Sequence, residues 1–114
     1  MMKVEIVYRG KVIGRSDLQP VDPPMGVAGG LFDPTPDYDP YLHAYNIDGD
    51  DNEVDSDALS ARSTEFGTIV CAGVGIEDFS KSLDELHVMV LGIGYPDYAT
   101  VFESHPLFKA YWRT

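Results

Sequence analysis

Six of the chain's eight prolines lie between Gln19 and Pro40, and this concentration restricts the fold more than any other feature of the sequence. A proline lacks the backbone N–H, fixes its own φ angle and disfavours helical geometry in the residue before it. Neither a regular helix nor an inner strand is therefore expected from Pro20 to Pro36. We predict a long Pro/Gly-rich loop over residues 19–40, and loops of this length are usually functional or disordered.

An apolar segment, residues 25–32, lies inside this predicted loop. Its apolar side chains would gain nothing in solvent, so we expect them to pack against a sheet and hold the loop down. They are Met25, Val27, Leu31 and Phe32. A second interpretation stays open, because glycines in the same segment allow a ligand to approach the backbone closely. In that case a small-ligand pocket lies between residues 25–32 and the sheet.

Alternating apolar and polar residues predict an N-terminal β-hairpin. Residues 3–8 alternate, Arg9-Gly10 is a turn signal, and residues 11–15 resume the extended pattern. An isolated hairpin is marginal in water, so this one must pair or pack with later segments.

Two later segments predict central strands, because they are apolar on both faces. They are residues 67–79 and residues 86–93, with residues 59–66 as a weaker candidate. In the first segment, one face is expected to carry Val70, Ala72, Val74 and Ile76. Together with the hairpin, these segments predict a small antiparallel sheet of about four or five strands.

A short helix is predicted over residues 40–46, because Asp39 is a suitable N-cap and Pro40 a suitable first helical residue. Four apolar or aromatic residues recur there at helical spacing and would share one face. They are Tyr38, Tyr41, Leu42 and Tyr45. We expect this face to pack on the core, and the alternative is an aromatic binding platform.

Two helical segments are predicted at the end of the chain. The first would begin at Pro96 and carry an apolar stripe of Tyr98, Val101, Phe102 and His105, and Pro106 should end it. A second apolar patch, Leu107, Phe108, Tyr111 and Trp112, should fold back onto the sheet. The predicted fold class is α+β, a small antiparallel sheet covered on one face by these segments. We expect a single domain over residues 1–114.

The charge of the chain is strongly lopsided. Residues 16–61 contain eleven acidic side chains and no Lys or Arg, whereas eight acids and eight bases balance elsewhere, which leaves a net charge of −11. Direct binding of nucleic acid depends on cations that neutralise phosphates, so this balance argues against it. A basic protein surface is the expected partner.

Six of the acidic side chains lie within residues 48–57, which we predict to be a mobile acidic surface loop. Asp48, Asp50 and Asn52 match the first positions of an EF-hand calcium loop, but Glu53 replaces its glycine and Leu59 its final glutamate. The motif therefore fails, and weak divalent-metal binding is left as an alternative. No cofactor is expected.

The sequence contains no complete catalytic motif. His43, His87 and His105 are not at metal-ligand spacing, and no nucleophile-elbow pattern is present. The lone Cys71 is expected to be a small buried residue kept reduced in the cytoplasm. We expect neither a signal peptide nor a membrane span, since the apolar runs are too short for both.

We therefore predict a soluble, non-enzymatic interaction protein that docks on a basic partner, as an inhibitor or an immunity-type protein would. The candidate contacts are the acidic side chains of the predicted loop and three tyrosines as aromatic anchors. They are Asp48, Asp50, Asp51, Glu53, Asp55, Asp57, Tyr38, Tyr41 and Tyr45. A small-ligand or divalent-metal domain is the second hypothesis, and an enzyme with an unrecognised site is the third.

Overall fold

Strands are the main secondary structure of the molecule. The structure, a computed structural model, describes residues 2–55 and 57–112, the side chain of Trp112 excepted. Within that range the structure contains 10 strands. Strands account for 48% of the residues and helices for 17%. The predicted α+β fold, with four or five strands covered by helices, is therefore wrong.

The strands are hydrogen-bonded side by side in a single curved sheet. Its order is β6-β5-β9-β10-β3-β2-β1-β7-β8, with β4 paired to β2. The elements in chain order are β1 (Met2–Tyr8), β2 (Lys11–Asp22), the 3-10 turn η1 (Pro23–Met25), β3 (Val27–Leu31), β4 (Asp33–Pro34), α1 (Pro40–His43), β5 (Asn46–Ile47), β6 (Asp50–Asp51), β7 (Ser60–Ser63), β8 (Gly67–Thr68), β9 (Gly73–Phe79), β10 (Glu85–Leu91), α2 (Tyr98–Phe102) and α3 (Pro106–Trp112).

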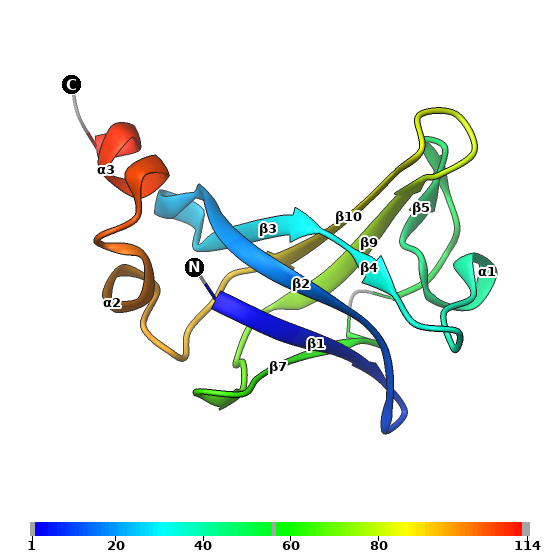
Figure 1. Cartoon of the computed structure of the whole chain (residues 1–114), viewed down its shortest axis with the longest axis horizontal. Helices are drawn as coiled ribbons and strands as arrows, with labels where there is room; N and C mark the ends of the chain where they lie inside the picture. Colours follow the sequence, from blue (N-terminus) through cyan, green and yellow to red (C-terminus); the bar gives the residue numbers. More distant parts are fainter. Residues whose placement is uncertain (1, 56, 113–114) are drawn as a thin grey trace.

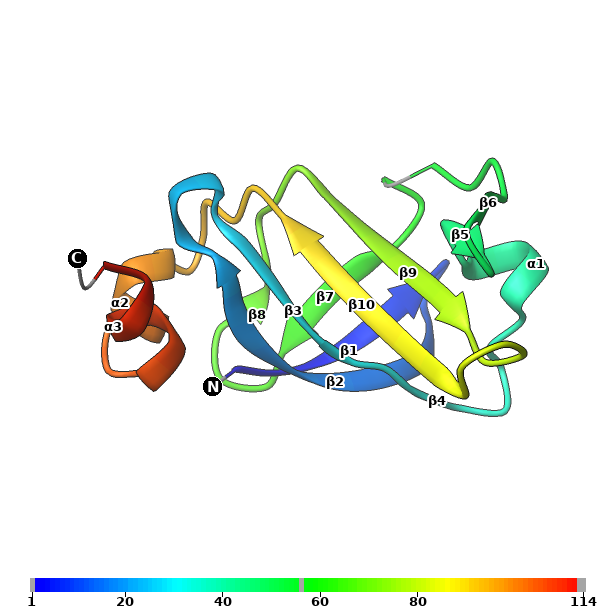
Figure 2. The ribbon, with the colours of Figure 1, turned by 90° about the horizontal axis from the view of Figure 1, so that it is seen from above.

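Strand β2 joins the two halves of this sheet. Its first part, up to Leu18, pairs with β1, and its last part pairs with β3. Figure 2 shows β9 and β10 crossing over β1 and β7, so the sheet folds back on itself and encloses the core between two layers. The side chains of Ile6, Ile76 and Val88 are fully buried there.

The predicted N-terminal hairpin is confirmed. Arg9 and Gly10 have φ angles of 48° and 81°, the positive values of a tight two-residue turn that matches the twist of the flanking strands. Strand β2 continues well beyond the predicted segment, however, because its second half has a partner in β3.

The predicted loop over residues 19–40 is wrong in its first half, since residues 19–22 and 27–31 lie in paired strands. Pro20 lies beyond the last β2 residue that pairs with β1 and next to an irregularity in the register with β3, where a proline is tolerated. Strand β3 is an inner strand between β10 and β2. Residues 27–31 are thus part of the sheet instead of a loop above it, and the hollow that reaches Gly29, Gly30 and Leu31 lies on the surface of the sheet.

The two apolar segments predicted as central strands form β9 and β10, which pair along their whole length. The prediction of one strand from residue 67 is wrong, because residues 67–68 form the separate strand β8 and the chain leaves the sheet before β9 begins at Gly73. Val70 is 60% exposed, whereas Ile69 is buried, the reverse of the expected alternation. Outside the named strands, Val70 forms an isolated bridge with Tyr95.

Helices α2 and α3 lie at one end of the folded sheet rather than over its face (Figure 1). Helix α2 begins after Asp97, whose carboxylate accepts a hydrogen bond from the Thr100 N–H, and not at Pro96 as predicted. Pro106 begins α3 instead of only ending the preceding helix. The predicted packing of the Trp112 side chain lies outside the described residues. No helix in the described part is long and apolar enough to cross a lipid bilayer.

Candidate functional site

The acidic segment forms a small hairpin at one edge of the sheet. Strand β5 pairs in parallel with β9, and β6 pairs with β5 through a turn at Asp48 and Gly49 with φ angles of 50° and 89°. The predicted mobile loop over residues 48–57 is thus replaced at its start by paired strand. We call residues 46–57 the acidic hairpin, and Ser56 within it lies outside the described residues.

Asn52 connects the acidic hairpin to helix α1. Its side-chain Nδ2 donates hydrogen bonds to the carbonyl oxygens of Pro40, Tyr41 and Ala44 at 3.0, 3.2 and 2.9 Å. The Pro40 oxygen also accepts the Ala44 N–H, whereas the Tyr41 oxygen is one of the carbonyl groups that a helix leaves unsatisfied at its C-terminal end. The start of α1 follows the prediction, since the Asp39 carboxylate accepts a hydrogen bond from the Tyr41 N–H. The helix is shorter than predicted and ends at His43.

A buried carboxylate, Asp78, lies beneath this assembly. It accepts hydrogen bonds from the Tyr38 hydroxyl at 2.7 Å, the Ser80 N–H at 2.9 Å and the Ser80 hydroxyl at 2.6 Å. Burial by itself would raise the pKa of Asp78, but these hydrogen bonds outweigh it, so the pKa lies below its ordinary value of 3.8. Burial, together with the hydrogen bond to Asp78, raises the pKa of Tyr38.

The six acidic side chains predicted as contacts are all exposed. They are Asp48, Asp50, Asp51, Glu53, Asp55 and Asp57. Two of them serve the local fold, because Asp48 accepts a hydrogen bond from the Ser82 hydroxyl and Asp51 accepts one from the Glu53 N–H. Over the described residues, none of the six forms an ion pair with a Lys, Arg or His side chain.

The tyrosines predicted to share a face are separated. Tyr41 and Tyr45 are 66% and 48% exposed next to the acidic hairpin, and Leu42 is also exposed. Tyr38 instead packs against Phe32 and His43, with its hydroxyl bound to Asp78. The exposed aromatic surface is therefore formed by Tyr41 and Tyr45, while Tyr38 supports the frame beneath them.

The groups considered for metal or nucleophilic chemistry are dispersed. His43 is buried between aromatic rings, accepts a hydrogen bond from the Asp39 N–H, and has a pKa lowered by burial. His87 contacts Glu85, two residues earlier on β10, at 3.1 Å. Burial raises the pKa of the Cys71 thiol, which disfavours the reactive thiolate. Within the described part of the chain, no three His, Cys, Asp or Glu side chains are grouped so as to hold a metal ion.

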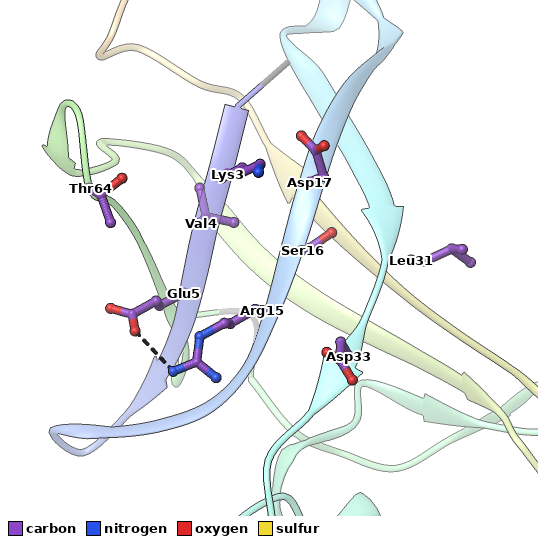
Figure 3. A pocket seen from close by; sticks show the side chains of 9 residues that line it. All are labelled: Lys3, Val4, Glu5, Arg15, Ser16, Asp17, Leu31, Asp33 and Thr64. Atoms are coloured by element: carbon purple, nitrogen blue, oxygen red, sulfur yellow. Dashed lines mark hydrogen bonds and ion pairs between the residues drawn. The ribbon is translucent and has the colours of Figure 1, made fainter.

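A separate hollow of about 410 Å³ lies across β1 and β2 (Figure 3). It carries charges of both signs, and these largely neutralise one another. Glu5 pairs with Arg62 at 2.8 Å and with Arg15 at 3.5 Å. The hydrogen bond from Arg62 is the main reason why the pKa of Glu5 is lowered. The acidic hairpin, whose charges are unpaired within the described chain, is therefore the stronger candidate site.

Comparison with known proteins finds no protein-family model that matches this chain, no similar curated protein and no similar solved structure. The assignment of a function therefore depends on the geometry and charge of the site.

Sequence reasoning missed Asn52 and Asp78. In the sequence, Asn52 matches only one position of a failed calcium motif, and its role depends on carbonyl oxygens of a neighbouring helix. Asp78 did carry a signal, because the alternation of β9 places it on the same face as the buried Val74 and Ile76. A carboxylate on an inward face requires hydrogen-bond donors, and Tyr38 and Ser80 supply them.

Proposed function

We propose that this chain is a non-enzymatic interaction protein that binds a basic surface of a partner protein through the acidic hairpin, as an inhibitor or an immunity-type protein does. The observation that carries the proposal is the exposure of six carboxylates that have no ion-pair partner in the described residues. Carboxylates that repel one another gain most from cations brought by a partner.

The frame beneath the hairpin supports this proposal. Asn52 holds the hairpin to α1, and the Asp48 N–H donates a hydrogen bond to the backbone oxygen of Asp78 at 2.8 Å. Groups held in place before binding lose less conformational entropy when the partner arrives. Tyr41 and Tyr45 add large exposed rings beside the charges, and tyrosine is among the residues that contribute most to protein interfaces.

The test uses a fluorescein-labelled oligolysine peptide, whose binding is followed by fluorescence anisotropy. The variant combines Asp50→Asn, Glu53→Gln, Asp55→Asn and Asp57→Asn, side chains that accept no side-chain hydrogen bond within the described residues. Exposed ion pairs contribute about 0.4 kcal/mol each, so the four changes should weaken binding about tenfold. Affinity for the unmodified chain should also fall as salt rises from about 0.05 to about 0.3 M.

A matched control removes the same charge elsewhere. It combines Asp33→Asn, Glu65→Gln, Asp84→Asn and Glu103→Gln, all at exposed positions outside the hairpin. This control should retain most of the affinity. Equal losses in both variants would mean that net charge alone attracts the peptide, and the proposal of a hairpin site would be rejected.

A further inference from the structure

The outer face of the sheet contains a row of three residues in which a methionine is flanked by two glycines. Met89 on β10 pairs with Gly75 on β9 and with Gly29 on β3. A Cβ atom placed on Gly29 would lie 2.6 Å from the Met89 sulfur, so this side chain lies across the glycine. We call the outward-facing surface around Gly75, Met89 and Gly29 the Met89 face. Figure 2 shows its strands from outside, with β10 between β9 and β3.

The Met89 side chain separates two hollows. The first, of about 270 Å³, is lined by Tyr45, Gly75, Glu77, Met89 and Leu91. The second, of about 470 Å³, is also lined by Met89 and extends over Gly29 to Val21 and Leu31. Val21 and Leu31 in the second hollow are 50% and 69% exposed, and Leu91 in the first is 39% exposed, so both hollows present apolar side chains to solvent. Methionine adapts its shape readily and is common at surfaces that bind helices.

The charge of this face is negative. Glu77 lines both hollows, and neither is lined by a Lys or Arg. Glu77 also pairs with Asn46, the first residue of the acidic hairpin. Tyr45 belongs to both surfaces, because it precedes the hairpin and lines the first hollow. The Met89 face and the acidic hairpin are therefore continuous, with apolar groups in one part and carboxylates in the other.

The spacing of this surface fits a helix. Gly75 and Gly29 are two strands apart, which is about 10 Å at the usual strand separation. Residues i and i+7 of an α-helix are about 10.5 Å apart, and residues i+3 and i+4 between them would lie over Met89. The path from β3 through β10, β9 and β5 to β6 is about 19 Å, the length of about 13 helical residues.

We propose that the Met89 face binds a basic amphipathic α-helix of the partner protein, laid across the strands. Apolar side chains at positions i and i+7 occupy the two hollows, and Lys or Arg side chains contact Glu77 and the acidic hairpin. This inference rests on the proposed function and specifies its partner. A second copy of the chain is a poor occupant, because each copy carries a net charge of −11 and would bring its own hairpin to the same interface.

The experiment compares two peptides of about 14 residues with the same numbers of Leu and Lys. In the first, Leu recurs at i, i+3, i+4 and i+7, which makes an amphipathic helix, and in the second the order is scrambled. We expect the amphipathic peptide to bind at least about tenfold more tightly. In ¹H–¹⁵N spectra, it should shift the amide signals of Gly29 and Gly75, which the scrambled peptide should leave in place.

The variant Met89→Gln with Leu91→Asn keeps the side-chain shapes and removes their apolar character. With this variant, the two peptides should bind with equal affinity. The salt-sensitive binding that depends on the hairpin acids should remain. If the first variant melts at a lower temperature than the parent chain, a second variant repeats the test. It combines Val21→Thr and Leu31→Ser, at side chains that are at least half exposed.

Three results would separate the possible failures. Equal binding of both peptides, lost only in the variant of the hairpin acids, would overturn the helix inference and leave the proposed function standing. If the amphipathic peptide binds the variant of the hairpin acids as tightly as the parent chain, but binds Met89→Gln with Leu91→Asn more weakly, the proposed function would be overturned. A dimer of the chain that Met89→Gln with Leu91→Asn dissociates would assign the face to a second copy and overturn the inference.

Discussion

Asp78 shows how one buried residue supports the candidate site. Its side chain is 2% exposed, and both of its oxygens accept hydrogen bonds, one from Tyr38 and one from Ser80. Its backbone oxygen also accepts a hydrogen bond from the Asp48 N–H in the acidic hairpin. Hydrogen bonds to a charged group contribute about 1.5–3 kcal/mol when the group is out of water. Asp78 thus links the sheet, the segment before α1 and the hairpin.

We predict that Asp78→Asn lowers the free energy of unfolding by about 1–3 kcal/mol at neutral pH. The pKa of Asp78 is lower in the folded chain than its ordinary value, so the carboxylate stabilises the fold above about pH 5. This contribution is lost as the pH falls through the folded-state pKa. Urea unfolding at about pH 7 and about pH 2 should therefore show a smaller difference between variant and parent at the lower pH.

The exposed Asp33→Asn serves as the control for this experiment, and its effect on unfolding should be small at both pH values. A cost of Asp78→Asn that stays constant with pH would show that packing, rather than the charge of the carboxylate, stabilises this position.

Strand β3 shows how glycine can make a strand possible, because the missing side chain lets a neighbouring strand come close. Gly30 lies so close to β2 that a Cβ atom there would be 2.5 Å from the backbone oxygen of Asp17. Glycine weakens a strand in isolation, and the neighbouring prolines led the sequence to predict a loop here. In the folded chain, β3 is paired on both sides, and the missing side chain is what allows β2 to come near.

Gly30→Ala is therefore expected to destabilise the fold by about 1–3 kcal/mol, because backbone has to move to admit the methyl group. Gly94→Ala is the matched control, since the nearest atom to a Cβ there is the Val70 oxygen at 3.8 Å. It should change stability by no more than about 0.5 kcal/mol. Thermal melting of both variants tests the pair, and equal melting temperatures would contradict the close approach at Gly30.

The whole molecule has two distinct ends (Figure 1). At one end α2 and α3 cover the opening of the folded sheet, and Phe102 is fully buried against Tyr98 at a ring separation of 4.8 Å. The Tyr98 hydroxyl donates a hydrogen bond to the Val27 oxygen at 2.7 Å, and burial raises the pKa of Tyr98 to about 12. At the other end lie α1 and β5, with the acidic hairpin.

Separate ends predict separate effects of mutation. Phe102→Ala should lower the free energy of unfolding by about 3–5 kcal/mol, because it leaves a cavity in the core. Leu107→Ala, at a side chain that is 49% exposed, should lower the free energy of unfolding far less. Under conditions where both variants are folded, their affinity for oligolysine should equal that of the parent chain. A loss of affinity in folded Phe102→Ala would show that the two ends are coupled.

The sequence by itself determined features that depend on residues close together in the chain. The turn at Arg9 and Gly10, the cap at Asp39, the inward alternation of β9 and β10, and the exposure of the acidic segment all follow from local backbone preference, side-chain period and charge. For the candidate site, this was enough to identify the exposed carboxylates, whereas the expectation that the tyrosine face packs on the core is wrong for Tyr41 and Tyr45, which are exposed.

Tertiary structure alone decided which segments became neighbours. The pairing of β3 with β10, the parallel contact of β5 with β9, and the position of α2 and α3 at one end join residues far apart in the chain. The stability of such contacts comes from burying apolar surface and completing hydrogen bonds across the fold, and no local preference contains that information. For the same reason, the Gly-Met-Gly row of the Met89 face exists only once three separate strands have paired.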